Sequence, residues 1–266
     1  MLIDTHCHLD KLDLSPYNDN LKDAVQAAGQ AGVQQILTIS VDLDGFEGIH
    51  SFTDIEGVFA SCGVHPLHKE GLLDAPDFLR TLAQRDKVVA IGETGLDYFY
   101  DKEPELHQAQ KDSFAIHLDV AGELNLPTII HTRDAKEDTL FLIKAHGNEN
   151  VGGVVHCFTE DYAMARAALD LNYLISISGI VTFKNAEDLR DTVRKIPLES
   201  LLVETDSPYL APVPHRGKKN EPKYVRDVAQ FVADLKGVRY EELLEITSQN
   251  FHQKFSKVVP TQTLRY

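Results

Sequence analysis

The fold follows from the stretch VVAIGETGLD (residues 88–97), PELHQAQKDSFAIHLDVAGEL (104–124) and TIIH (128–131). The apolar runs 88–92 and 128–131 are typical of buried strands. The segment between them places apolar side chains at helical spacing and opens on a proline, which the first turn of a helix tolerates. Asn125 and Pro127 end this helix. A strand, a helix and a second strand predict one βαβ unit of a parallel sheet.

The same alternation extends outward along the chain. Two more helices are expected near the end, one that starts at Asn220 and Pro222 and ends at Gly237, and one over 240–255. Further strands are predicted at 2–5, 35–40, 58–63, 153–156, 173–177 and 201–204. Eight strand–helix units in 266 residues indicate an α/β protein with a single (β/α)8 TIM barrel as one domain over residues 1–266. The alternative is an open doubly wound sheet, which no GxGxxG or GxxxxGKS/T loop supports.

Composition favours a globular protein of the cytoplasm. The hydrophobic fraction is 43% and the charged fraction 25%. No apolar stretch approaches the roughly 18 residues that span a bilayer, and the first residues lack the features of a signal peptide, so no membrane association is expected. Cys7, Cys62 and Cys157 are odd in number and show no CxxC spacing, which fits a reducing compartment. We expect Cys7 and Cys157 to pack on the strand faces opposite their neighbouring histidines.

The net charge of −15 limits the classes of partner. Broad, nonspecific binding to nucleic acid usually needs a basic surface. A nucleic-acid substrate would therefore have to be recognised locally. Nothing in the sequence indicates a protein partner.

Polar residues follow the predicted strands where a barrel gathers its chemistry, at the C-terminal strand ends. His6 and His8 are two residues apart after the first strand, so both point to the same face. Val89, Ile91 and Glu93 are expected to share one face of the fourth strand. A carboxylate in that position needs a partner. Two bridged cations would supply one, and a salt bridge to Arg or Lys is the alternative.

Three further strands end in candidate ligands. His131 and His156 end the fifth and sixth strands at equivalent positions. A single histidine at a strand end is usually a core residue, but two at equivalent positions of neighbouring strands favour a shared site. Asp206 follows the eighth strand and is expected to bind metal and act as general base; a helix cap is the alternative. Glu204 would orient Asp206 or a ligating histidine. Nitrogen donors mixed with carboxylates favour Zn²⁺, Mn²⁺, Fe²⁺ or Mg²⁺ over Ca²⁺, and six ligands favour two metals.

Other polar residues are candidates for substrate contacts. His65 is expected to touch substrate or to order the turn before Pro66. The planar fork of Arg133 matches phosphate oxygens. Asp97 is expected to support the loop that follows the fourth strand. The basic loop HRGKKN (215–220) includes Arg216 and Lys218, which would hold a phosphate or simply be solvated.

Seven motifs of this chain occur together in one known family. They are IDTHCHLD (3–10), CGVHP (62–66), IGETGLDYFY (91–100), IIHTRDA (129–135), HCFTED (156–161), ISISGIVTFKNA (175–186) and LLVETDSPYLAPVPHRGKKNEP (201–222). From residue 2 to about residue 255 the sequence resembles the TatD-type deoxyribonucleases of the metal-dependent hydrolase superfamily, and it is most similar to the YcfH-like branch. The resemblance implies a TIM barrel and Mg²⁺-dependent 3′→5′ exonuclease activity on DNA. It also implies metal ligation by His6, His8, Glu93, His131, His156 and Asp206.

One departure from the family pattern bears on the substrate. Many active nucleases of the family carry Ser-Gly after His-Cys-Phe, whereas this chain has Thr159 and Glu160. The change brings a carboxylate toward the expected site and bears on substrate choice.

The sequence therefore predicts a divalent-metal-dependent phosphodiesterase acting on DNA or a small phosphodiester, with two ions of Mg²⁺, Mn²⁺ or Zn²⁺. We expect His6, His8 and Asp206 to hold one ion, His131 and His156 to hold the other, and Glu93 to bridge them. Asp206 and Glu93 are the expected catalytic residues, with a metal-activated water as nucleophile. The alternatives are hydrolysis of a small amide, lactone or aminoacyl ester by the same machinery, and a non-catalytic metal-binding barrel.

Overall fold

Eight parallel strands form the centre of the molecule. The computed structural model describes residues 1–68 and 76–258. Within them, the strands form one sheet in which each pairs in parallel with the next along the chain. The strands are β1 (Leu2–Cys7), β2 (Val33–Thr38), β3 (Val58–Cys62), β4 (Val88–Asp97), β5 (Thr128–Arg133), β6 (Gly153–Val155), β7 (Tyr173–Ile177) and β8 (Leu201–Val203).

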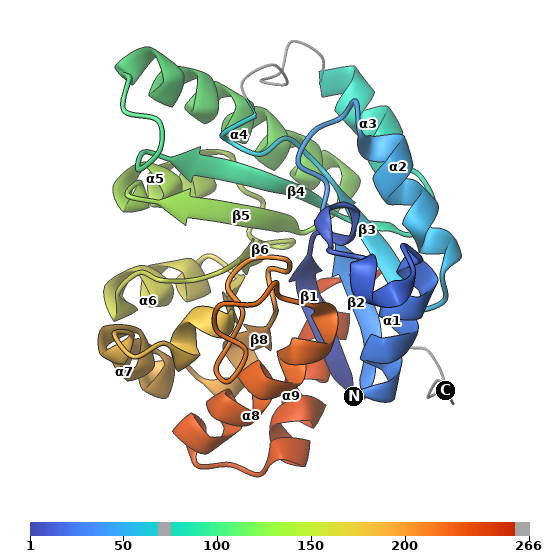
Figure 1. Cartoon of the computed structure of the whole chain (residues 1–266). Coiled ribbons are helices and arrows are strands. Elements are labelled where there is room, and N and C mark those ends of the chain that lie inside the picture. The colour runs from blue at the N-terminus through green and yellow to red at the C-terminus, as the bar shows by residue number, and fades with distance from the viewer. Residues whose placement is uncertain (69–75, 259–266) are drawn as a thin grey trace.

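The sheet curls until its first strand meets the segment after its last. Cys7 and Ser207 form a parallel bridge, and the backbone N–H of Asp206 donates to the carbonyl of His6 over 3.0 Å. The barrel is thus nearly closed, and the helices lie around its outside (Figure 1). These observations confirm the predicted (β/α)8 barrel.

Helices alternate with the strands as the sequence predicted. They are α1 (Leu21–Gln30), α2 (Phe46–Ser51), α3 (Pro76–Ala83), α4 (Pro104–Leu124), α5 (Lys136–His146), α6 (Tyr162–Asp170), α7 (Glu187–Lys195), α8 (Val225–Lys236) and α9 (Tyr240–Lys254). The prediction for α4 is confirmed at both ends, with Asn125 ending it at a φ of 53°. No helix in residues 1–68 or 76–258 has the length and apolar character needed to cross a bilayer.

The start of α8 differs from the prediction. A short 3-10 turn, Pro222–Tyr224, precedes the helix, which begins only at Val225. Asn220 instead uses its side-chain amide to donate to the carbonyls of Thr205 and Tyr209, over 2.8 and 2.6 Å. Asn220 therefore fastens the loop after β8 and does not begin the helix.

The core has an outer part between strands and helices and an inner part inside the barrel. Ile3 of β1, Val89 of β4 and Ile129 of β5 belong to one buried cluster, although their strands are not all neighbours, so they meet inside the barrel. Phe251 and Phe255 at the end of α9 pack against the same cluster. This packing fills the barrel interior and leaves the C-terminal strand ends for polar residues.

The predicted common face of Val89, Ile91 and Glu93 is wrong. Val89 packs inside the barrel, whereas Ile91 packs with Leu79 and Leu82 on the helix side. The pairing of β3 with β4 shifts register between Val88 and Ala90, which puts Val89 and Ile91 on different faces, and the pairing of β4 with β5 shifts again between Ile91 and Thr94. The irregularity turns Glu93 toward the barrel mouth, and β4 continues beyond it to Asp97.

Candidate metal centre

Glu93 lies at the centre of a group of histidines at the C-terminal end of the barrel. Its side chain is only 3% exposed. Its two carboxylate oxygens face different histidines. Oε2 lies 3.3 Å from Nε2 of His6 and 3.8 Å from Nε2 of His8. Oε1 lies 2.8 Å from Nε2 of His156, 3.1 Å from Nδ1 of His131 and 3.4 Å from Nε2 of His65.

Asp206 completes the cluster from the loop after β8. Its Oδ1 lies 3.7 Å from Nε2 of His6 and 3.4 Å from Nε2 of His8. Its side chain remains 13% exposed, whereas that of His6 is fully buried. Of these two residues, Asp206 is therefore the one that solvent reaches at the barrel mouth.

A second carboxylate fixes each of two histidines. Nε2 of His131 donates to Oδ2 of Asp97 over 3.1 Å, which leaves its Nδ1 facing Glu93. Nδ1 of His156 donates to Oε1 of Glu204 over 3.3 Å, which leaves its Nε2 facing Glu93. Histidine ligands in metal sites are commonly oriented by such a carboxylate. Of the two roles foreseen for Glu204, the structure shows the contact with a histidine.

The donor atoms fit divalent metal ions. Buried atoms without a hydrogen-bond partner include Nδ1 and Nε2 of His6, Oε2 of Glu93 and Nε2 of His156. Such atoms are rare in folded proteins and call for a partner. Three sets of donor atoms lie within 4.8 Å of one another: His6, His156 and Asp206; His6, His8 and Glu93; and His65, Glu93 and His131. Mixed imidazole and carboxylate donors suit Zn²⁺, Mn²⁺, Fe²⁺ or Mg²⁺.

These sets differ in two ways from the expected division of ligands. The ring of His156 stacks on that of His6 with 3.8 Å between centroids, so His156 also reaches the set that contains Asp206. His65 joins Glu93 and His131 as a further candidate ligand. The sequence motif CGVHP signalled His65 without separating a ligand from a substrate contact.

The electrostatics keep Glu93 ionised. Burial alone would raise the pKa of Glu93, but the neighbouring His156, His65 and His6 hold it well below its ordinary value. Burial lowers the pKa of His6, and the nearby His156 lowers it further. Glu93 thus stays anionic, the form in which a carboxylate binds metal.

His117 of α4 helps to fix the backbone just before His65. Nδ1 of His65 accepts the backbone N–H of Leu67 over 3.1 Å, a contact within the turn around Pro66. The preceding N–H, that of Val64, donates to Nε2 of His117 over 3.0 Å, and Nδ1 of His117 donates to the carbonyl of Ser113 over 2.7 Å. Because Val64 is 53 residues away in the sequence, no local pattern could have assigned this contact to His117.

The other predicted substrate residues lie around the cluster. The guanidinium of Arg133 lies 4.0 Å from the ring centroid of Phe99. That of Arg216 lies 3.7 Å from the ring centroid of Phe183 and donates to the carbonyl of Ala211 over 3.0 Å. Lys218 is exposed. Arg133 ends β5, and Arg216 and Lys218 lie in the segment after β8, so all three are on the C-terminal side of the barrel.

Two further sequence expectations concern residues after β6. Glu160 is half-buried, and burial raises its pKa although Lys136 opposes the shift. The prediction that Cys157 packs on a strand face is wrong, because β6 ends at Val155. Cys157 instead has a φ of 43°, is partly exposed, and places Sγ 3.2 Å from Oγ of Ser178. Cys7 does pack in the outer core, and Cys7, Cys62 and Cys157 are all free thiols.

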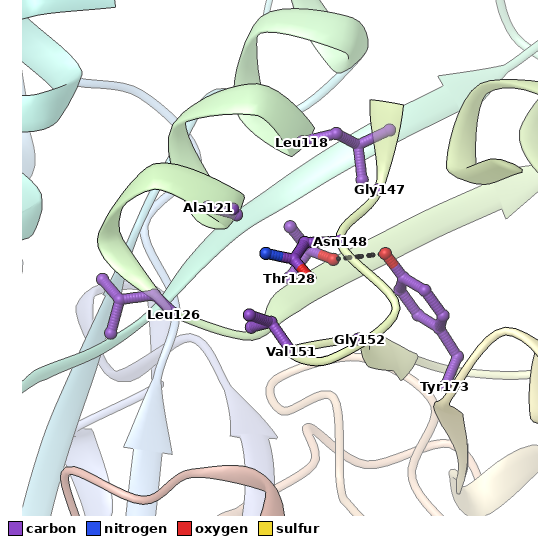
Figure 2. Close-up of a pocket in the computed structure, with 10 residues that line it drawn as sticks. Leu118, Ala121, Leu126, Thr128, Gly147, Asn148, Val151, Gly152 and Tyr173 are labelled. Carbon is purple, nitrogen blue, oxygen red and sulfur yellow. Dashed lines mark hydrogen bonds between the residues drawn. The ribbon is translucent and has the colours of Figure 1, made fainter. Parts of the chain in front are cut away.

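A recess at the opposite end of the barrel offers no competing site. Figure 2 shows it between the end of α4 and the starts of β5 to β7, where Thr128 donates to the hydroxyl of Tyr173 over 3.1 Å. Leu118, Ala121 and Leu126 supply much of its apolar wall. The recess is too narrow to admit a water molecule. It is a packing defect, and the metal cluster remains the candidate site.

Known proteins share this arrangement of strands and motifs. A family model described as TatD related DNase matches residues 3–256. The chain belongs to the TatD family. The uncharacterized metal-dependent hydrolase YcfH of Escherichia coli K12 is 49% identical, over 96% of this chain and 95% of that protein. YabD of Bacillus subtilis 168, also an uncharacterized metal-dependent hydrolase, is 39% identical over 96% and 99%.

A solved TatD structure has the same fold. The crystal structure of the TatD homologue YjjV from Escherichia coli K12 superposes with a TM-score of 0.88 at 30% identity, covering 97% of this chain and 98% of that one. Membership of the TatD family makes the chain a metal-dependent hydrolase. The cluster around Glu93 supplies donors for the metal that this class requires.

Proposed function

We propose that this TatD-family hydrolase is a two-metal phosphodiesterase that removes nucleotides from DNA in the 3′→5′ direction. The observation that carries the proposal is that the two oxygens of the Glu93 carboxylate face different histidines. One of its oxygens faces His6 and His8, and the other faces His65, His131 and His156. A carboxylate shared in this way suits a bridge between two cations.

The ligands then fall into two groups. His6, His8 and Asp206 would hold one ion. His131 and His156 would hold the other, joined by His65. When bound, the two ions would lower the pKa of a water molecule and stabilise negative charge on the phosphoryl oxygens.

The chain's own residues complete the chemistry. Asp206 lies at the open edge of the cluster, where it accepts a proton from the attacking water and orients it. Asp97 and Glu204 keep His131 and His156 in the tautomers that aim a free nitrogen at the centre. Arg133 and the basic loop with Arg216 and Lys218 bind the flanking phosphates. Arginine suits this task because its planar fork matches two phosphate oxygens.

The test starts from metal-free protein, to which Mg²⁺, Mn²⁺ or Zn²⁺ is returned separately. Cleavage of 3′-end-labelled single-stranded DNA is followed for the wild type and for Asp206→Asn. The matched control is Asp188→Asn, an exposed carboxylate on α7. We expect metal-dependent release of mononucleotides by the wild type and the control, and its loss in Asp206→Asn. Metal-loaded wild type that leaves DNA and chromogenic phosphodiesters intact would reject the proposal.

One observation favours the alternative of a carbonyl substrate. The charges of Asp134, Glu137 and Asp161 act on the half-buried Glu160 in the segments after β5 and β6, with Lys136 as the opposing cation. Negative charge on this side of the mouth would repel the phosphodiester backbone of DNA. Turnover of carboxyl esters or amides with no turnover of phosphodiesters would support this alternative. A full metal complement without turnover of any ester would support a non-catalytic barrel.

A further inference from the structure

Two exposed aromatic rings flank the metal cluster. Tyr100 follows β4 and is 61% exposed, and Tyr209 follows β8 and is 49% exposed. In a closed sheet of eight strands, β4 and β8 are four strands apart in either direction, so the two loops face each other across the barrel mouth. The mouth thus carries an aromatic ring on each of two opposite sides of the metal cluster.

The ring of Tyr100 belongs to a preorganised group. Oδ1 of Asp97 accepts the backbone N–H groups of Phe99 and Tyr100 over 3.0 and 2.8 Å. The two rings meet edge to face with 4.9 Å between centroids. The guanidinium of Arg133 lies 4.0 Å from the centroid of Phe99 and 4.9 Å from that of Tyr100. The ammonium group of Lys102 adds a second positive charge 5.0 Å from the centroid of Phe99.

The ring of Tyr209 is tied directly to the metal cluster. It meets the ring of His8 in a T-shaped contact with 5.9 Å between centroids. Its backbone N–H donates to the carbonyl of Asp206 over 2.9 Å, and its own carbonyl accepts the amide of Asn220. The loop that presents this ring is therefore fixed relative to Asp206.

Positively charged side chains lie beside the aromatic rings, so this surface suits a polyanion. Arg133 forms no ion pair within 4 Å in the portion of the chain that the structure describes; its charge acts on Asp97, and its guanidinium lies beside the rings of Phe99 and Tyr100. The guanidinium of Arg216 lies over the ring of Phe183, and Arg216 is in the same segment after β8 as Tyr209. Aromatic rings interleaved with cations are typical of surfaces that bind unpaired bases and the phosphates between them. In a duplex the faces of the bases are covered by their neighbours, so the same rings would find no partner.

We propose that Tyr100 and Tyr209 stack on unpaired bases of a single-stranded polynucleotide whose phosphodiester lies at the metal cluster. This inference rests on the proposed phosphodiesterase function, and it assigns the base-binding surface for that substrate. Phe99 and Arg133 support the ring of Tyr100. Because every base has an aromatic face, the surface binds single strands with little sequence preference.

The test measures binding, so it does not depend on turnover. A fluorescently labelled thymidine oligonucleotide with phosphorothioate links binds to the metal-loaded protein, and anisotropy gives its Kd. An abasic strand of the same length is the second ligand. The variants are Tyr100→Ala, Tyr209→Ala and the conservative Tyr100→Phe and Tyr209→Phe. The matched control is Phe141→Ala, because Phe141 is 68% exposed on α5, outside the mouth.

We expect each Tyr→Ala change to weaken binding of the base-bearing strand about tenfold, within the range measured for stacked bases. Binding of the abasic strand should not change, and the Phe variants and Phe141→Ala should bind like wild type. Equal affinity for the two strands, or unchanged affinity in both Ala variants, would overturn the proposal. So would the absence of binding to wild type at about 1 mM, well above typical nonspecific Kd values.

The two proposals fail in different ways. A protein that binds the strand through these rings but does not cleave DNA when metal-loaded would reject the phosphodiesterase and keep the base-binding surface. Cleavage of DNA together with unchanged affinity in Tyr100→Ala and Tyr209→Ala would keep the phosphodiesterase and reject the base-binding surface.

Discussion

Asp97 and His131 join the metal cluster to the loop at the barrel mouth. Nε2 of His131 donates to one oxygen of Asp97 over 3.1 Å, while the other oxygen accepts the backbone N–H groups of Phe99 and Tyr100. One buried carboxylate therefore sets both the orientation of a candidate ligand and the shape of the loop beside it. The prediction that Asp97 supports the loop after β4 is confirmed. Its contact with His131 was not part of that prediction.

The first prediction concerns this carboxylate. Asp97→Ala should weaken metal binding by about 10- to 100-fold, because His131 would lose the partner that fixes its tautomer and ring orientation. Competition with a chromophoric chelator measures the affinity. The matched control is Asp138→Asn, because Asp138 accepts the hydroxyl of Tyr98 on the same loop without touching His131. Equal loss of affinity in both variants would show that the loop matters and that the contact with His131 does not.

A second prediction tests the shared carboxylate. Glu93→Ala should remove metal binding and activity, because both sets of histidines lose their common partner. Metal content after dialysis and metal-dependent turnover check it, with Asp188→Asn as the control. Unchanged turnover in Glu93→Ala would remove Glu93 from the mechanism.

The third prediction concerns the pH dependence of stability. Burial lowers the pKa of His117 to about 4, so the folded protein keeps this imidazole neutral. The unfolded chain takes up a proton near pH 6.5, where histidine ordinarily titrates. Since the unfolded state binds more protons between pH 6.5 and 4, the free energy of unfolding falls as the pH falls through that window. The loss between pH 7.5 and 5 is about 2 kcal/mol.

Urea unfolding of metal-free protein at both pH values checks this prediction. Other groups titrate in the same range, so the comparison is with His117→Gln, which removes the imidazole while retaining polar atoms. The variant should lose about 2 kcal/mol less than wild type on acidification. Parallel pH profiles for the two proteins would contradict the assignment.

The fourth prediction concerns the close approach of β4 to β5. Gly95 has a φ of +137°, and a Cβ there would lie 2.0 Å from the carbonyl oxygen of His131. Gly95→Ala should lower the free energy of unfolding by about 3 kcal/mol, because both the backbone conformation and the contact oppose it. It should also weaken metal binding, since the strand that carries His131 must move. Chemical denaturation and chelator competition measure the two effects.

Gly48 provides the matched control for this change. It lies in α2, and a Cβ there would meet nothing within 4 Å. Gly48→Ala should be neutral or stabilise the protein by about 0.5–1 kcal/mol, because alanine is the better helix former. Similar destabilisation by both changes would mean that the contact with His131 has no special role.

The sequence by itself determined the barrel and the location of its chemistry. Strand and helix periods are local properties of the chain, so the alternation around 88–131 predicted the βαβ unit and the rest of the barrel. Candidate ligands such as His6, His131 and Asp206 follow predicted strands, and parallel strands in a closed barrel bring their C-terminal ends together. The candidate donors could therefore be named before the distances between them were known.

Tertiary structure alone decided which atoms meet. The shift of register after Ile91 turned Glu93 into the mouth, and only there do its two oxygens divide between five histidines from the ends of four strands. Glu204 meets His156 and not Asp206, and His117 reaches Val64 from another element. These contacts join residues far apart in the sequence, and they depend on side-chain direction and strand irregularity. A local residue pattern carries no information about either, because hydrogen bonds and metal ligation are fixed by positions in space.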